Sequence, residues 1–207
     1  MLEYMRAGGS IMWVIAFLSV VALAVALERL FFYWRARTDP QSLEAALSRA
    51  LRSGDMEAAR QLTEASDSSL HRLFAAVLSA WDLPSDAMKL LAEQQVRREL
   101  YRWEKHLPIL EAVGRIAPLL GLLGTVVGMV EMFSSLHLGA AIDTAAVTGG
   151  IGKALYTTVA GLAVAIPTML VYSLLQGFVD SEAETLERGS DFLLRERLIC
   201  DSLLPES

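Results

Sequence analysis

Threonine hydroxyls within two long apolar stretches are the groups of this chain that could do chemistry. Thr125 lies in the stretch 116–138, and Thr157 and Thr158 lie in the stretch 154–179. Inside a membrane, such a hydroxyl either donates back to a backbone carbonyl one turn earlier or faces a polar cavity. The pattern therefore has two interpretations, which are local bonding within each helix and a hydroxyl-lined path for an ion.

Small residues recur beside these threonines at helical spacing. In each stretch they fall at i, i+4, i+7 and i+11, which places them on one face of a helix. Helices in lipid associate through such faces, because close backbone approach replaces the hydrophobic effect as the driving force. We therefore predict close helix packing here, and packing alone is the simpler alternative to an ion path. The packing residues are Ala117, Gly121, Gly124 and Gly128 in the first stretch, and Ala154, Gly161 and Ala165, beside Thr158, in the second.

The elements that must position these residues are membrane helices. The chain of 207 residues is 54% hydrophobic and 20% charged, and its mean hydropathy is +0.41. Crossing ~30 Å of hydrocarbon takes ~20 apolar residues in a helix. Residues 7–27, 116–138 and 154–179 meet this length. The first stretch lacks a small-residue cleavage site after it, so we interpret it as a retained anchor rather than a secretory signal.

Lysine and arginine predict the orientation of these spans. Residues 35–115 carry many of them, whereas the connection 137–152 carries none. Because cytoplasmic loops hold the excess of basic residues, we expect the N-terminus outside, the long loop inside, the short loop outside and the C-terminus inside. The predicted segments are 1–34 (outer N-terminus and transmembrane helix 1), 35–108 (cytoplasmic helical domain), 109–138 (transmembrane helix 2), 139–148 (short outer loop), 149–179 (transmembrane helix 3) and 180–207 (cytoplasmic C-terminal tail).

The predicted cytoplasmic domain is a small helical bundle. Its apolar residues recur at helical spacing, and no segment alternates apolar and polar residues as a strand does. Asp55 is predicted to cap one helix, and Ser68 or Ser69 to open another. A long helix is predicted to begin at Pro84 and to continue through Pro108 into the second span.

The sequence argues against an enzyme. Cys200 is the single cysteine, and His71, His106 and His137 lie far apart along the chain. Neither a metal cluster nor a nucleophilic triad is expected from them. No P-loop spacing is present, and the net charge of −6 implies no nucleic-acid partner. We therefore predict that the protein is not an enzyme and has no metal site and no cofactor.

Two segments resemble a known family. Residues 117–129 read APLLGLLGTVVGM, and residues 149–167 read GGIGKALYTTVAGLAVAIP. Both resemble the MotA/TolQ/ExbB proton channel family, and the opening AGGSIMWVIAFLSVVALAVALERL is most similar to its ExbB branch. The resemblance covers the whole chain in the order of its spans and the lengths of its loops.

The resemblance implies an all-α integral membrane protein with three transmembrane helices and a cytoplasmic helical domain. Helices 2 and 3 would line a pore in a homo-oligomer, expected to be a pentamer embedded in membrane lipid, and an ExbD-like single-span partner would sit in the pore. Thr125 and Thr158 match the family's two pore threonines, with Thr157 beside them, and would pass protons to a carboxylate on the partner. The spans carry no carboxylate at their centre, so that group would have to come from elsewhere.

Lys153 departs from the family's pattern. ExbB-type proteins often carry a glutamate five residues before the third-span threonine, and Lys153 stands there instead. Glu131 follows Thr125 by six residues and Lys153 precedes Thr158 by five, which is about 9 and 8 Å of helix rise towards the outer face. We predict that Glu131 and Lys153 form an ion pair at the outer mouth of the pore. Two separately solvated charges are the alternative.

The function that the resemblance implies is an ExbB-like subunit of an inner-membrane proton-driven motor. With an ExbD-like partner, and with a TonB-like protein, it would use the proton motive force to energise TonB-dependent outer-membrane transport. The alternatives are a TolQ-like subunit for envelope integrity and division, a flagellar-type stator, and a non-conducting membrane scaffold. The expected location is the bacterial inner membrane, multi-pass, with a periplasmic N-terminus, a periplasmic loop 139–148 and a cytoplasmic C-terminus.

Overall fold

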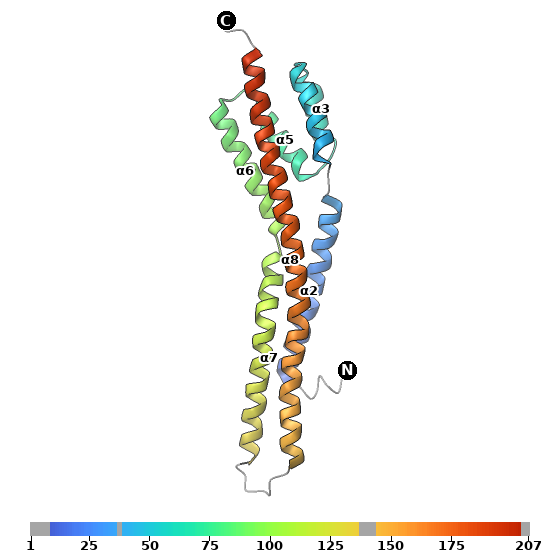
Figure 1. Ribbon diagram of the computed structural model, residues 1–207, viewed down its shortest axis with the longest axis vertical. Helices are drawn as coiled ribbons and strands as arrows, with labels where there is room; N and C mark the ends of the chain where they lie inside the picture. The colour runs from blue at the N-terminus through green and yellow to red at the C-terminus, as the bar shows by residue number, and fades with distance from the viewer. Residues whose placement is uncertain (1–8, 37–38, 137–143, 204–207) are drawn as a thin grey trace. The chain divides into compact units, whose positions relative to one another are not determined.

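Helices make up all the regular secondary structure in the part of the chain that the structure describes. Figure 1 shows the computed structural model, which describes residues 9–36, 39–136 and 144–203. Three of its helices are long and apolar enough to cross a membrane, over Gly9–Trp34, Leu107–Ser134 and Ala154–Cys200. The prediction of an all-α protein with three helices able to span a membrane is confirmed.

The chain divides into two compact units. The first comprises Met1–Leu30 and His106–Leu175, and the second comprises Phe31–Lys105 and Gln176–Ser207. The helices in the described ranges are α2 (Gly9–Ala36), α3 (Pro40–Arg52), α4 (Met56–Glu64), α5 (Ser69–Leu78), α6 (Ser85–Glu104), α7 (Leu107–Leu136) and α8 (Thr144–Leu203). Helices α2 and α8 contribute residues to both units.

In the first unit, α2, α7 and the beginning of α8 run side by side (Figure 1). Many of its buried residues are small, such as Ala117, Ala154 and Ala165, while large apolar side chains such as Leu119 and Phe133 are exposed. This distribution suits a lipid environment, where large apolar groups face hydrocarbon and small residues let helix backbones approach.

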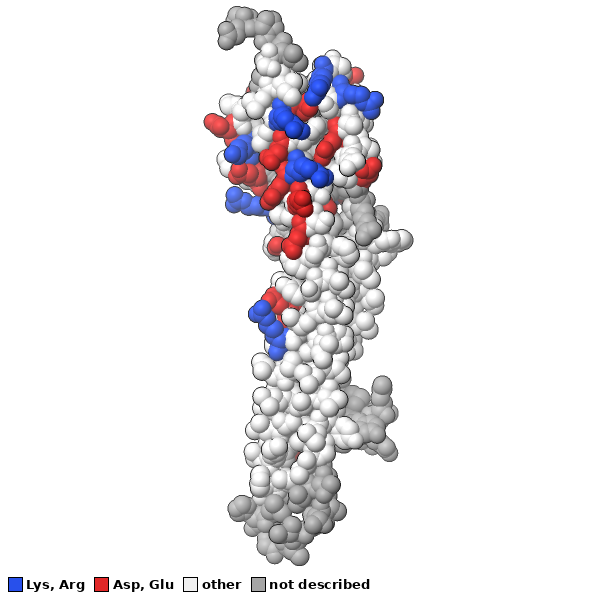
Figure 2. Space-filling model, in the orientation of Figure 1, with Lys and Arg blue, Asp and Glu red and all other residues white. Residues whose placement is uncertain are grey.

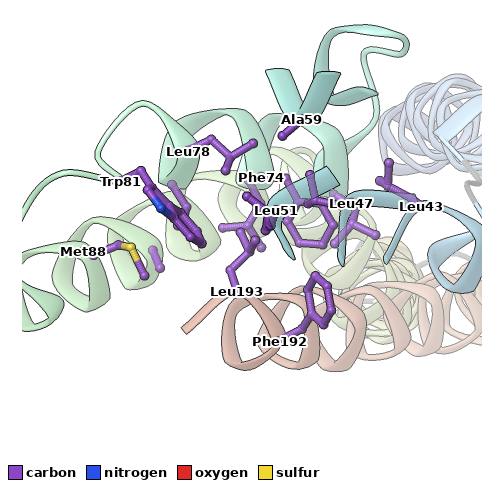
Figure 3. Close-up of a cluster of buried hydrophobic side chains, with 14 of the residues drawn as sticks. Leu43, Leu47, Leu51, Ala59, Phe74, Leu78, Trp81, Met88, Phe192 and Leu193 are labelled. Carbon is purple, nitrogen blue, oxygen red and sulfur yellow. The ribbon is translucent and has the colours of Figure 1, made fainter. Parts of the chain in front are cut away.

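The second unit has a conventional hydrophobic core. Apolar side chains from α3, α5, α6 and α8 meet there, many of them leucine or aromatic (Figure 3). Leu47, Phe74 and Leu193, which come from three different helices, are completely buried. Each such side chain contributes roughly 1.5–3 kcal/mol through its removal from water. The core therefore requires that segments distant in the sequence fold together.

The helix starts in the second unit follow the capping rules that the sequence analysis used. The Asp55 side chain accepts a hydrogen bond from the Ala58 amide at 2.9 Å, and the Ser68 side chain accepts one from the His71 amide. Each bond satisfies an amide that the first helical turn leaves without a partner. The predicted caps at Asp55 and Ser68 are confirmed.

The prediction that one helix runs from Pro84 through Pro108 into the second span is wrong. Helix α6 ends at Glu104, and α7 begins at Leu107. Lys105 has an extended backbone with ψ of 131°, and His106 has a positive φ of 71°. The break lies just before Pro108, which has no amide to donate and is best tolerated in the first turn of a helix.

Helix α8 continues well past the apolar stretch. Residues 180–203, which belong to the predicted C-terminal tail, are helical in the described range. Leu186 and Leu193 are completely buried, and Phe192 lies in the same core. This segment therefore belongs to the packing of the second unit.

Candidate functional site

The backbones of α7 and α8 approach closely along the predicted faces of small residues. A Cβ placed on Gly161 would lie 2.5 Å from the carbonyl oxygen of Ala117 and 3.2 Å from the Cα of Gly121. A Cβ on Gly121 would lie 3.0 Å from the Cα of Thr158. Side chains larger than hydrogen do not fit at these glycines unless the helices move apart.

The same contact continues towards the C-terminal end of α7. A Cβ on Gly124 would overlap the Thr157 side chain, and one on Gly128 would lie 3.2 Å from the Cβ of Ala154. Contacts thus pair later positions in α7 with earlier positions in α8, so the two helices are antiparallel. Of the remaining predicted packing residues, Ala117 and Ala165 are buried.

Two of the three predicted threonine hydroxyls meet at one carbonyl across the contact. Both Thr157 Oγ1 and Thr158 Oγ1 donate to the carbonyl oxygen of Gly121, each at 3.2 Å. Thr157 Oγ1 also lies 2.7 Å from the carbonyl oxygen of Ala154, within its own helix. Thr157 is 1% exposed, whereas Thr158 is partly exposed. The Gly121 carbonyl therefore accepts hydrogen bonds from two hydroxyls of α8 and links the two helices.

Thr125 Oγ1 makes a local bond and does not contact the other hydroxyls. It donates to the carbonyl oxygen of Leu122 at 2.6 Å, as the back-bonding interpretation anticipated. At ~100° per residue, Thr125 lies about 40° from Gly121 around α7, and Thr158 lies about 60° from Gly161 around α8. Because the two helices are antiparallel, these two rotations place Thr125 and Thr158 on the same side of the helix pair. We call this side, with Thr125 and Thr158 on it, the threonine flank.

Glu131 lies away from the threonine flank. It is about 120° around α7 from Thr125 and lines a small cavity of about 40 Å³ together with Ser10 of α2, Gly128 and Thr157. A cavity of this size with polar walls is large enough for a water molecule. The side chain of Lys153 lies outside the described residues, so the ion pair with Glu131 stays a prediction.

The two histidines in the described residues each have a local partner within their own unit. His71 Nδ1 lies 2.7 Å from Ser68 Oγ in the second unit, and His106 Nδ1 lies 3.2 Å from a carboxylate oxygen of Glu28 in the first. Burial lowers the pKa of His71 below its ordinary value. The described residues contain no group of three or more His, Cys, Asp and Glu side chains that could hold a metal ion; His137 lies outside them.

Two features of the helix contact were not predicted from the sequence. Gly114 packs against Met169, because a Cβ there would overlap the Met169 side chain. Its spacing of seven from Gly121 continues the glycine face by two turns, and this signal could have revealed it. The role of the Gly121 carbonyl as a shared acceptor has no counterpart in sequence, since every residue has a carbonyl.

Comparison with known proteins identifies a family and several relatives of this chain. The family model described as MotA/TolQ/ExbB proton channel family matches residues 64–188, which include both threonine-bearing stretches. The chain is 34% identical to biopolymer transport protein ExbB-like 1 of Synechocystis sp., over 84% of this chain and 69% of that protein. It is 32% identical to ExbB-like 3 of the same organism, over 79% of each chain. It is also 29% identical to biopolymer transport protein exbB1 of Vibrio cholerae, over 89% of this chain and 83% of that protein.

Proposed function

This chain belongs to the MotA/TolQ/ExbB proton channel family, and we propose that it is an ExbB-like subunit of a proton-driven motor in the bacterial inner membrane. In this proposal, copies of the chain form a homo-oligomer, with a pentamer as the expected state, around the single helix of an ExbD-like partner. The assembly uses the proton motive force to energise TonB-dependent transport across the outer membrane.

The names of the relatives favour the ExbB branch over the TolQ branch. The relatives from Synechocystis sp. and Vibrio cholerae are all named as ExbB or ExbB-like biopolymer transport proteins. The matches extend over most of both chains, so the similarity is not confined to one shared helix. A TolQ-like role in envelope integrity is the competing function that the experiment below distinguishes.

The observation that carries the proposal is the threonine flank. Thr125 and Thr158 each direct the single hydroxyl proton to a backbone carbonyl, of Leu122 and Gly121 respectively. Their remaining lone pairs are then free to accept a hydrogen bond from a group opposite the flank. A protonated carboxyl group on the partner helix is such a donor.

The carboxyl group must come from another chain in this proposal. Residues 112–130 of α7 and 154–179 of α8 contain no Asp or Glu, so the centre of the helix pair offers hydroxyls but no proton carrier. A carboxylate in hydrocarbon is costly unless it is protonated or hydrogen-bonded. Hydroxyl acceptors on α7 and α8 would stabilise the neutral carboxyl at the middle of the membrane.

The orientation in the membrane follows from the basic residues. We place the N-terminus in the periplasm, and the second unit, which holds most of the Lys and Arg, in the cytoplasm. Site-directed labelling of Glu3→Cys and Ser53→Cys in a Cys200→Ser background tests this placement. An impermeant thiol reagent added to spheroplasts should label position 3 and leave position 53 unlabelled.

Deletion of the protein from its host tests the function. Uptake of iron chelates under iron limitation and sensitivity to detergent are measured in the same strains. Lost uptake with an intact envelope is expected for the ExbB-like motor. Detergent sensitivity with normal uptake would move the assignment to the TolQ-like role.

Complementation with Thr158→Val separates a conducting protein from a scaffold. The substitution keeps the shape of the side chain and removes the hydroxyl, so a proton path should fail while a scaffold should work. Thr168→Val is the matched control, because Thr168 Oγ1 donates only within α8, to Val164 at 2.7 Å, and Thr168 lies away from the threonine flank. Full function with Thr158→Val would refute conduction through this hydroxyl.

A further inference from the structure

Helix α7 carries an ion pair on its exposed surface. Glu111, Arg115 and Glu131 are the charged residues between Leu107 and Ser134. Arg115 and Glu111 lie one turn apart, with 2.6 Å between Arg115 Nη2 and Glu111 Oε1. Figure 2 shows a small group of acidic and basic side chains set apart on an otherwise uncharged stretch of surface. A charged group on a membrane helix has a high desolvation cost and is commonly functional.

The pair lies on the same side of α7 as the threonine flank. At ~100° per residue, Glu111 is about 40° and Arg115 about 80° around the helix from Thr125, and both turn away from the contact with α8. Arg115 precedes Thr125 by ten residues, or about 15 Å of helix rise. That distance is half of the ~30 Å hydrocarbon layer. With Thr125 at mid-membrane, Arg115 would lie at the inner boundary of the hydrocarbon.

The two partners of the pair differ in exposure. The Arg115 side chain is 71% exposed, whereas that of Glu111 is 30% exposed. The carboxylate is set back against the helix and holds the guanidinium outward, so the positive charge is the part that a neighbouring group would meet.

We propose that Arg115 is a cation-excluding residue at the cytoplasmic end of the ion path, and that Glu111 is its positioning residue. This inference rests on the proposed function, because it requires that the threonine flank lines the path. In a homo-oligomer, each copy would add one outward guanidinium to a ring of like charge.

The ring discriminates between protons and other cations, because a proton can cross while bound to a neutral group, whereas potassium and sodium ions keep their charge. Rings of Arg or Lys around a pore repel cations, so potassium or sodium ions meet an electrostatic barrier. A hydronium ion is repelled by the ring as well, so a proton must pass the guanidiniums on a neutral, protonatable group of the partner helix that lies opposite Arg115. The threonines thus serve proton transfer, and Arg115 prevents a leak of the abundant cytoplasmic cations.

The test measures potassium leak and proton uptake in the same liposomes, which contain the complex of this chain with its partner. Arg115→Gln is expected to increase potassium efflux roughly tenfold, which corresponds to about 1.4 kcal/mol, with proton uptake retained. Arg115→Lys keeps the charge and should leak no more than the unmodified complex. Arg97→Gln is the matched control, since Arg97 forms an exposed pair with Glu93 at the same i, i+4 spacing, on α6 of the second unit.

Each outcome decides between the alternatives. Unchanged potassium efflux with Arg115→Gln would overturn the proposal and indicate that the guanidinium faces lipid head groups. Equal leaks from Arg115→Gln and Arg115→Lys would overturn it too, because the loss would then reflect packing rather than charge. An unmodified complex that takes up no protons would refute the proposed function, and the inference would fail with it.

Discussion

Gly161→Ala should move α7 and α8 apart and break the hydrogen bonds from the threonine hydroxyls to the Gly121 carbonyl. The added Cβ would lie 2.5 Å from the carbonyl oxygen of Ala117 and 3.2 Å from the Cα of Gly121. Both are backbone atoms, so no side-chain rotation can relieve the overlap. Since a Cβ essentially never approaches another heavy atom within 3.0 Å, the helices must part by at least about 0.5 Å.

That separation removes the hydrogen bonds that cross the contact. The bonds from Thr157 and Thr158 to the Gly121 carbonyl are 3.2 Å long. A length of about 3.7 Å exceeds what a hydrogen bond allows. Overpacking costs about 1–3 kcal/mol, and the lost Thr158 bond costs about 0.5–1.5 kcal/mol, whereas Thr157 keeps its bond to the Ala154 carbonyl. The better helix propensity of alanine returns up to about 1 kcal/mol. We expect a net loss of about 2 kcal/mol.

Gly152→Ala is the matched control in the same helix. A Cβ there meets no atom within 4 Å, so the substitution should leave stability unchanged or raise it slightly. For a chain of this size, a loss of about 2 kcal/mol lowers the melting temperature by about 4–8 °C. The assay is thermal unfolding of the two purified variants, together with proton uptake by their complexes in liposomes. Equal melting temperatures, or full proton uptake with Gly161→Ala, would refute the reasoning.

Three further predictions concern charges. Arg72→Met should destabilise the second unit by about 3 kcal/mol, because it leaves the buried Glu99 carboxylate without its main partner at 2.6 Å; a urea unfolding midpoint that does not move would contradict this. Glu131→Lys with Lys153→Glu should restore function lost in each single variant if the two side chains pair, and no restoration would argue for separate solvation. The lowered pKa of His71 means that the folded state binds its proton less readily than the unfolded state. Stability should therefore be complete above pH ~6.5 and fall as the pH drops below that value, and His71→Gln should flatten this slope in melting temperatures measured from pH 7.5 to 5.

Local sequence signals predicted the helices and several of their ends. Hydroxyl and carboxylate caps act within three residues, so Asp55 and Ser68 could be recognised without knowledge of the fold. The length of the apolar stretches was sufficient for the membrane helices, because hydrocarbon thickness sets the number of residues required. The same local rules failed between Glu104 and Leu107, where a positive φ at His106 breaks the chain of helical bonds.

The candidate site was only partly accessible to sequence reasoning. Helical periodicity grouped the small residues and placed Thr125 and Thr158 on or beside their faces, because both follow from the 3.6-residue repeat. Periodicity could not identify the partner of each face. The sequence therefore left open whether the hydroxyls bond within their own helices or face a polar cavity. It did not indicate the bonds from Thr157 and Thr158 across to the Gly121 carbonyl, which the structure contains beside the local bond of Thr157.

By itself the sequence determined the class of the protein, its three helices that are long and apolar enough to span a membrane, and the faces through which two of them associate. These properties depend on composition and on interactions between residues close in the chain. Only the tertiary structure decided that the Gly121 carbonyl receives two hydroxyls, that Glu131 lines a cavity away from Thr125, and that Arg115 turns outward from Glu111. Such features depend on the rotation and separation of packed helices, to within tenths of an ångström, and packing between distant residues sets those quantities.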